Sequence, residues 1–261
     1  MKWTGSKRSQ AARIAALAPP HARYVEPFLG GGAALYHLAG EGAVGSDLYA
    51  PLIAFWTLVR DDPEAVIADY AHQWRRLQDD SPGYFYAVRA RFNAEQAPAD
   101  LSFLMRTCVN GIVRFSKAGD FNNSFHLSRR GMLPARFAPV VRAWSARIQG
   151  VTFIARDYRE TLAQTRTGDF VYLDPPYAGN HQRYIGGIDE AALFAALDDL
   201  NRRGVSWALS FDGQRGERVY RAQVPAELYQ RRLALVSGHS AVAKVLNGPL
   251  ETVSEALYLN Y

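Results

Sequence analysis

Short apolar runs and amphipathic stretches alternate at both ends of the chain, on either side of a long amphipathic block. Five apolar runs have the length expected for buried strands: residues 23–28, 43–46, 151–155, 170–173 and 205–210. Apolar spacing of three and four residues predicts helices over residues 33–39, 51–59 and 189–202, and over most of residues 60–150. Strands that alternate with helices around a helical block indicate one α/β sheet interrupted by an insertion.

Residues 110–125 break the helical block. Gly111, Gly119 and the pair Asn122 and Asn123 mark turns there, which predicts a hairpin-like loop. The pattern therefore predicts a discontinuous α/β domain over residues 1–58 and 150–261, with residues 59–149 as the insertion.

Composition narrows the class of protein. Of the 261 residues, 48% are hydrophobic and 21% charged, which is enough for a packed core. No run approaches the roughly 18 apolar residues of a membrane span, and no apolar signal-peptide core follows the N-terminus, so we expect a soluble, intracellular protein. Cys108 is the single cysteine and the six histidines lack metal-ligand spacing, so neither a disulfide nor a metal site is expected.

Positive charge is concentrated in the insertion. The net charge is +5, yet residues 101–150 hold eight basic residues against one acidic residue. Such concentration is typical of a protein that binds a polyanion, and nucleic acid is the first candidate. Because 26 of the 30 basic residues are arginine, an arginine-rich surface without a partner is the alternative.

A glycine turn follows the first predicted strand, in the sequence Glu-Pro-Phe-Leu-Gly-Gly-Gly of residues 26–32. Glycines there allow positive φ and close approach of backbone to a ligand. Leu35 occupies the third glycine position of the dinucleotide fingerprint and no P-loop occurs, so we expect a nucleoside pocket without phosphates. Asp47 ends the second predicted strand, where a carboxylate can accept both ribose hydroxyls. A plain turn and a helix N-cap are the alternatives.

The strongest signal is Asp174-Pro175-Pro176-Tyr177, directly after a predicted buried strand. An exocyclic nucleobase amine is a poor nucleophile because its lone pair is delocalised into the ring. Acceptors on both N–H groups, Asp174 and the Pro175 carbonyl, would draw the nitrogen toward tetrahedral geometry and free that lone pair. The prolines fix φ and withhold competing donors, and Tyr177 would stack on the base. A rigid turn with a surface tyrosine is the alternative; an amide substrate is disfavoured, because enzymes that modify glutamine amides carry Asn first.

These motifs resemble the Dam-type (D12 class) DNA adenine N6-methyltransferases over nearly the whole chain. The opening Lys2-Trp3-Thr4-Gly5-Ser6-Lys7 is similar to the family's Lys-Trp-x-Gly-x-Lys, and residues 255–261 resemble its closing strand. The resemblance implies a Rossmann-like sheet that uses S-adenosylmethionine, and a mostly helical target-recognition insertion carrying a β-hairpin. It implies cofactor contacts from Trp3, Lys7, Glu26, Pro27, Phe28, Gly30, Gly32, Asp47, Asp157 and Tyr158. Arg156 stands where the family has Gly before that aspartate.

The insertion loop also resembles the family. Residues 110–115 and 119–122 are similar to its Asn-Gly-x-x-Arg-Tyr and Gly-x-Phe-Asn, a hairpin that enters duplex DNA and helps to extrude the adenine. Arg114 can donate two hydrogen bonds to a guanine edge, and Lys117, Arg129 and Arg130 can neutralise phosphates. The resemblance extends the expected DNA contacts to Lys2, Asn110, Ile112, Phe115, Asn122 and Ser124. Relatives that recognise GATC often have Pro in place of Ser124, so GATC is favoured but the site is open.

The resemblance implies a site-specific methyltransferase that flips adenine from duplex DNA and methylates N6. Cytosine N4 methylation is the nearest alternative, although such enzymes more often carry Ser in place of Asp174. An inactive DNA-binding or regulatory protein of the same fold and an RNA substrate are further alternatives. Double-stranded DNA is the expected partner, a cognate restriction endonuclease is a candidate, and no membrane is expected. We expect a monomer or weak dimer in a bacterial or phage-type cytoplasm.

Overall fold

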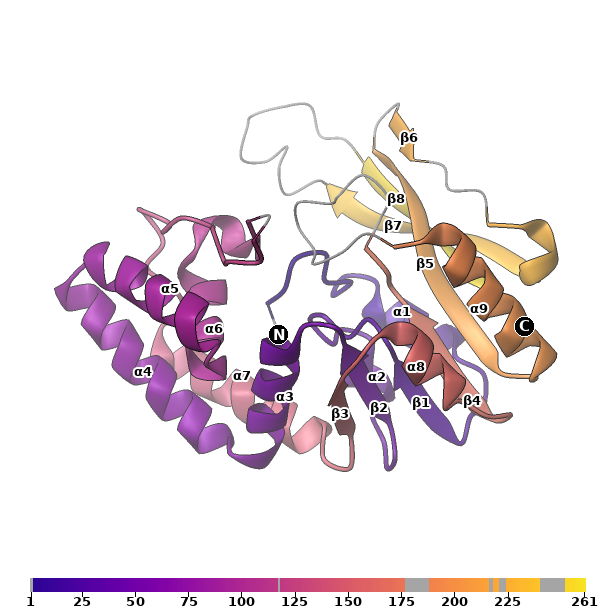
Figure 1. Cartoon of the computed structure of the whole chain (residues 1–261), viewed down its shortest axis with the longest axis horizontal. Helices are drawn as coiled ribbons and strands as arrows, with labels where there is room; N and C mark the ends of the chain where they lie inside the picture. The colour runs from indigo at the N-terminus through magenta and orange to yellow at the C-terminus, as the bar shows by residue number, and fades with distance from the viewer. Residues whose placement is uncertain (1, 117, 177–187, 216–217, 221–223, 240–251) are drawn as a thin grey trace.

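A helical lobe and a sheet lobe lie side by side in the computed structural model of the chain (Figure 1). The structure describes residues 2–116, 118–176, 188–215, 218–220, 224–239 and 252–261. Within these residues, no helix is both long enough and apolar enough to cross a membrane.

The sheet is formed by the strands at the two ends of the chain, in the order β3-β2-β1-β4-β5-β8-β7. Neighbouring strands from β3 to β5 are parallel, whereas β8 is antiparallel to both β5 and β7. The short strand β6 pairs with the end of β5. The strands span Arg23–Glu26 (β1), Val44–Asp47 (β2), Thr152–Ala155 (β3), Asp169–Leu173 (β4), Ser206–Arg215 (β5), Arg218–Tyr220 (β6), Arg231–His239 (β7) and Thr252–Leu259 (β8).

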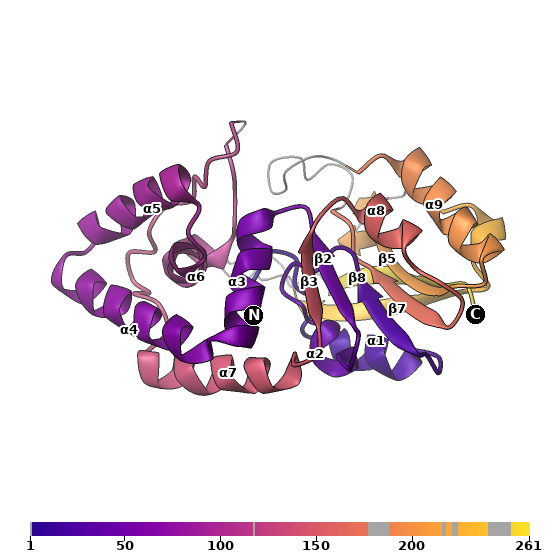
Figure 2. The same ribbon diagram turned by 60° about the horizontal axis from the view of Figure 1, so that its bottom comes forward.

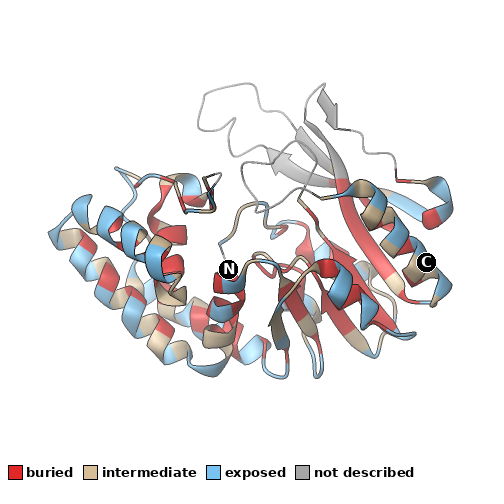
Figure 3. Cartoon of the chain, viewed as in Figure 1, coloured by how far each residue is buried: buried red, intermediate tan, exposed pale blue. Residues whose placement is uncertain are grey.

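Helices cover both faces of the sheet, as Figure 2 shows. They are α1 (Ala11–Leu17) and α2 (Leu35–Leu38) on one face, and α8 (Tyr158–Ala163) and α9 (Glu190–Arg202) on the other. Alternate residues of the central strands supply the two cores: Phe170 and Tyr172 join one buried cluster, and Val171 and Leu173 join the other. All five residues of β4 are therefore buried (Figure 3), as expected for a strand covered on both faces.

The insertion is helical. Its helices are α3 (Ala50–Asp61), α4 (Pro63–Asp79), α5 (Gly83–Glu95), α6 (Pro98–Thr107) and α7 (Pro134–Arg147). Proline occupies the first position of α4, α6 and α7, where its missing N–H costs no hydrogen bond. Two 3₁₀ turns, Val109–Gly111 and Ala226–Leu228, complete the described helices.

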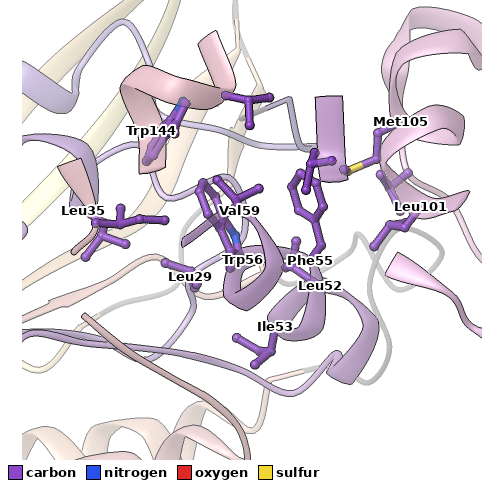
Figure 4. Close-up of a cluster of buried hydrophobic side chains, with 14 of the residues drawn as sticks. Leu29, Leu35, Leu52, Ile53, Phe55, Trp56, Val59, Leu101, Met105 and Trp144 are labelled. Carbon is purple, nitrogen blue, oxygen red and sulfur yellow. The ribbon is translucent and has the colours of Figure 1, made fainter. Parts of the chain in front are cut away.

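Helix α3 joins the two lobes through one hydrophobic cluster (Figure 4). Its side chains Phe55 and Trp56 pack in the same cluster as Leu29 from the sheet side and Met105 from α6. The predicted domain boundary at residues 58 and 59 falls inside this helix. The hydrophobic core is thus continuous across the predicted boundary. The division of the chain into two domains stays a prediction.

The predicted fold class is confirmed: a Rossmann-like α/β sheet carries a mostly helical insertion. Several predicted elements differ in extent, and two of these differences have a clear physical cause. The strand predicted over residues 205–210 continues to Arg215, because β8 and β6 supply partners for its second half. The helix predicted over residues 33–39 shortens to Leu35–Leu38, because the glycine turn before it continues through a hydrogen bond from Gly32 N to Leu29 O.

Candidate active site at the carboxyl ends of the strands

Acidic residues gather where the parallel strands end. Glu26 and Asp47 are the last residues of β1 and β2, and Asp174 directly follows β4. Because the strands are parallel, these carboxyl ends lie at one edge of the sheet. The strand order reverses between β1 and β4, and open α/β sheets bind their ligands at such a switch point.

Asp174 is held by an ion pair. The Lys7 ammonium lies 2.9 Å from its Oδ1, and only 6% of the Lys7 side chain and 18% of the Asp174 side chain are exposed. Burial raises the pKa of the Asp174 carboxyl to about 6, although Lys7 acts in the opposite direction. Pro175, the next residue, is buried. The site thus holds a carboxylate that is ionised at neutral pH but close to titration.

The glycine turn packs against two tryptophans. Gly30 has φ of +45°, and a Cβ there would lie 2.9 Å from Trp3 Cδ1. The Gly30 carbonyl accepts a 3.0 Å hydrogen bond from Trp56 Nε1. Gly32 has φ of +61° and lies against the Trp56 ring. Side chains at these two positions would therefore displace the turn, which explains the glycines physically.

Asp47 is tied to the same turn. Its Oδ2 accepts a hydrogen bond from Gly30 N at 3.0 Å, and its Oδ1 accepts one from Tyr49 N at 3.0 Å. Burial nevertheless raises the pKa of this carboxyl. Each carboxylate oxygen keeps a further lone pair, so Asp47 can accept hydroxyl donors from a ligand without leaving the backbone.

Glu26 is buried beside Asp47. The Tyr24 hydroxyl donates a 2.7 Å hydrogen bond to its Oε2. Burial raises the pKa of Glu26 to about 8, so the carboxyl is mostly protonated at neutral pH. A cationic ligand group would favour its ionised form, which makes Glu26 a suitable partner for an ammonium.

An aromatic pair includes one residue of the turn sequence. Phe28 and Tyr158 stack with ring centroids 5.0 Å apart. Asp157 caps α8 by accepting from Arg159 N at 2.8 Å, and it also pairs with the Arg159 side chain. Its carboxylate is thus engaged in this structure. Pro27 is buried between Glu26 and Phe28.

The recognition loop, residues 108–126, is closed by two isolated antiparallel bridges, Cys108 to Phe125 and Phe115 to Phe121. The predicted hairpin turns back on itself as expected, but its described part is no regular two-stranded ladder. The buried Asn123 amide holds it instead, donating to Val109 O at 3.0 Å and Ile112 O at 2.7 Å.

Six of the ten residues predicted to bind DNA are exposed, and three of these, Asn110, Arg114 and Ser124, lie in this loop. Arg114 is exposed, and its Nε donates to Asn122 Oδ1 at 2.8 Å. Phe115 is buried against Tyr49 and Phe121, so its ring braces the loop. Asn110, Ser124, Arg129 and Arg130 are exposed and Ile112 is half-buried. Lys117 and Tyr177 lie outside the described residues.

The N-terminal segment connects the two groups of predicted residues. Lys2 lies across Gly111, where any side chain would collide with it. The Thr4 hydroxyl accepts from Val113 N at 2.8 Å and lies 3.2 Å from Val113 O. Sequence reasoning assigned no role to Thr4 or to Glu255, whose Oε1 lies 3.5 Å from the Lys7 ammonium. A lone carboxylate beside an otherwise apolar stretch, residues 256–259, was the available signal for Glu255.

The described residues contain no group of three His, Cys, Asp or Glu side chains able to hold a metal ion. The absence of a metal site stays a prediction. The burial of the Cys108 thiol raises its pKa to about 11, so this thiol is protonated at neutral pH.

Comparison with known proteins identifies relatives along most of the chain. A sequence model of the family described as D12 class N6 adenine-specific DNA methyltransferase matches residues 3–231. A DNA adenine methylase of Vibrio cholerae serotype O1 is 29% identical over 236 residues, covering 85% of this chain and 84% of that protein. A DNA adenine methylase of Haemophilus influenzae is 27% identical, with 77% and 72% covered. The Type II methyltransferase M.MjaIII of Methanocaldococcus jannaschii is 26% identical, with 80% and 82% covered.

Proposed function

The chain belongs to the D12 class N6 adenine-specific DNA methyltransferase family, and we propose that Asp174 and the Pro175 carbonyl carry its methyl transfer to adenine. One observation supports this most strongly. Asp174 directly follows the buried strand β4 at the switch point, and its side chain is largely removed from water. An acceptor fixed in such a place strengthens each hydrogen bond that it receives.

The chemistry follows from these two acceptors. The Asp174 carboxylate accepts one N–H of the adenine amine and the Pro175 carbonyl accepts the other, which localises the nitrogen lone pair. N6 then forms its bond to the methyl carbon while the bond from that carbon to sulfur breaks. The methylated nitrogen must lose one proton, and Asp174, with its pKa near 6, is the adjacent acceptor.

S-adenosylmethionine is the proposed methyl donor, and it supplies a methyl group made electrophilic by its sulfonium. The residues at the sheet edge fit such a molecule: Asp47 offers acceptor lone pairs for ribose hydroxyls, and Glu26 offers a carboxyl for an ammonium. The buried Ser6 Oγ next to Gly31 has no hydrogen-bond partner among the described residues. Phe28, Tyr158 and Trp3 would provide the apolar contacts, and Asp157 would accept from the adenine of the donor after leaving Arg159.

A test of this assignment is calorimetric titration of S-adenosylmethionine into Asp47→Ala. Loss of two charge-assisted acceptors should weaken binding about 10- to 100-fold. Thr152→Ala, an exposed change on β3, is the control and should bind as wild type. Equal affinity in Asp47→Ala would remove Asp47 from the cofactor site.

DNA is the substrate of the family, and we propose that the recognition loop contacts it as a duplex. Adenine must leave the base stack to reach Asp174, so an element has to enter the duplex near the catalytic edge. Arg114 would give up its hydrogen bond to Asn122 and donate to the edge of a guanine base instead. Lys2, Asn110, Ile112, Asn122 and Ser124 would contact nearby bases, Phe115 would brace the loop, and Arg129 and Arg130 would contact phosphates. GATC is the favoured site. A restriction partner and a monomer or weak dimer stay predictions.

Nucleoside mass spectrometry tests the proposal. Plasmid DNA incubated with the protein and S-adenosylmethionine should yield N6-methyladenine, and DNA incubated with Asp174→Ala should yield none. Exclusive N4-methylcytosine would overturn the adenine assignment, and equal product from Asp174→Ala would overturn the proposed site. Sequencing of the modified bases in the same DNA identifies the recognised sequence.

A further inference from the structure

The Lys7 ammonium lies between two carboxylates. It is 2.9 Å from Asp174 Oδ1 and 3.5 Å from Glu255 Oε1. Lys7 comes from the N-terminal segment, Asp174 from the end of β4, and Glu255 from β8, two strands farther along the sheet. Three parts of the chain that are distant in sequence thus place one cation and two anions together, with no more than 18% of any side chain exposed.

The position of Glu255 suits a role at the site better than a role in the fold. The β8 residues after it, Ala256 and Leu257, are buried in the hydrophobic cores, whereas Glu255 lies at the β5 bulge, opposite Gly213. Its Oε2 is buried and has no hydrogen-bond partner among the described residues. A carboxylate with one weak ion pair and one unsatisfied oxygen is able to bind a cation more fully than it does here.

Asp174, in contrast to Glu255, already has a close partner for one carboxylate oxygen. Its Oδ1 already receives Lys7, yet the proposed reaction requires Asp174 to accept an N–H of adenine. A lysine that stayed fully on Asp174 would compete with the substrate for the same lone pairs, and a buried lysine that left Asp174 would be better stabilised by a second anion nearby. Glu255 is the one described carboxylate, besides Asp174, within ion-pair distance of Lys7.

We propose that Glu255 is a positioning residue that takes over the Lys7 ammonium when Asp174 binds the adenine amine. This inference rests on the proposed function of Asp174. Lys7 stays charged and paired throughout, first mainly with Asp174 and then mainly with Glu255. Asp174 is thereby kept ionised before the substrate arrives and released when the substrate is in place.

Glu255→Gln tests the proposal, because it keeps the shape of the side chain and removes its charge. With saturating DNA and S-adenosylmethionine, the single-turnover rate constant should fall about 10- to 100-fold, the range for loss of one charged hydrogen-bonding partner. The affinities for DNA and S-adenosylmethionine should stay within about twofold. Glu255→Asp retains the charge with a shorter reach and should give an intermediate rate constant.

The pH profile separates this role from a structural one. Asp174 is surrounded by Lys7, by Glu255 and by Glu26 and Tyr24 of β1, which interact with it electrostatically. Glu255 raises the pKa of Asp174, so its replacement by Gln should move the acidic limb of the rate profile to lower pH. Glu227→Gln removes an exposed carboxylate near the opposite end of β5 and should change neither rate nor profile.

Two results would overturn the inference while leaving the proposed function intact. A wild-type rate constant and pH profile in Glu255→Gln would show that Lys7 needs no second anion. A reduced active fraction with an unchanged rate constant would show that Glu255 serves folding alone. If Asp174→Ala itself retained wild-type turnover, the proposed function would fail instead, so the two failures are distinguishable.

Discussion

The carboxyl edge of the sheet and the recognition loop both present polar side chains to a substrate, but they hold them differently. At the sheet edge, Asp47 ends β2 and Asp174 directly follows β4, and neighbours on both sides fix the register of each strand. Burial raises the pKa of both carboxyls. In the recognition loop, Arg114 is exposed and tied to Asn122 of the same loop.

This contrast matches what each region has to do. Methyl transfer needs an acceptor that is placed before the substrate arrives, because preorganised dipoles cost no rearrangement during the reaction. Base recognition needs donors that can exchange an internal partner for a base edge. A strand end meets the first requirement, and a loop held by side-chain hydrogen bonds meets the second.

The largest expected effect on the rate of methyl transfer comes from a substitution at the sheet edge. Asp174→Asn replaces a charged acceptor by an amide, and we expect single-turnover methyl transfer to slow by about 10²–10³-fold, as for loss of one preorganised catalytic group. Binding of DNA and S-adenosylmethionine should change little. Asp198→Asn, an exposed change on α9, is the matched control. A rate within twofold of wild type would show that the rigid edge does not carry the chemistry.

A smaller and more selective effect is expected in the loop. Arg114→Ala should cost about 1–3 kcal/mol of discrimination at one base pair, measured by methylation of a set of single-substitution duplexes. Arg130→Ala should instead weaken binding to every sequence equally and lower the salt dependence of binding. If the Arg114 variant also lost affinity uniformly, its side chain would be a phosphate contact, and the contrast between the regions would weaken.

The smallest effect concerns the connection between the two regions. Thr4→Val removes the hydroxyl that bonds Val113, and we expect a loss of about 1 kcal/mol in the free energy of unfolding. Urea unfolding measures this loss, with Thr152→Val as control. The coupling between cofactor and DNA affinities should also fall, because Thr4 stands between Trp3 and the loop. Unchanged coupling would mean that the two regions act independently.

Sequence alone predicted the sheet edge well, because each strand end carries its own local signal. Asp47 and Asp174 follow apolar runs directly, so the strand prediction also placed their side chains. The structure of the loop was harder to predict from the sequence. Nothing local indicates that hydrogen bonds from the Asn123 amide, rather than a regular strand ladder, hold the loop together. The position of Glu255 near Lys7 could not be predicted from the sequence. It depends on the pairing of β8 with β5, which is a long-range contact.

Burial makes the acidity of Asp174 the most informative quantity in the molecule. Its pKa is raised to about 6, and only the ionised carboxylate can accept the amine proton. The ratio kcat/KM for DNA, which reports the groups of the enzyme before DNA binds, should therefore be constant at high pH, be half-maximal near pH 6 and fall about tenfold per pH unit below that. Initial-rate assays from pH 5 to 8.5, at DNA concentrations well below KM, measure this profile directly. A kcat/KM that is flat across this range, or that rises as pH falls, would contradict the role of Asp174.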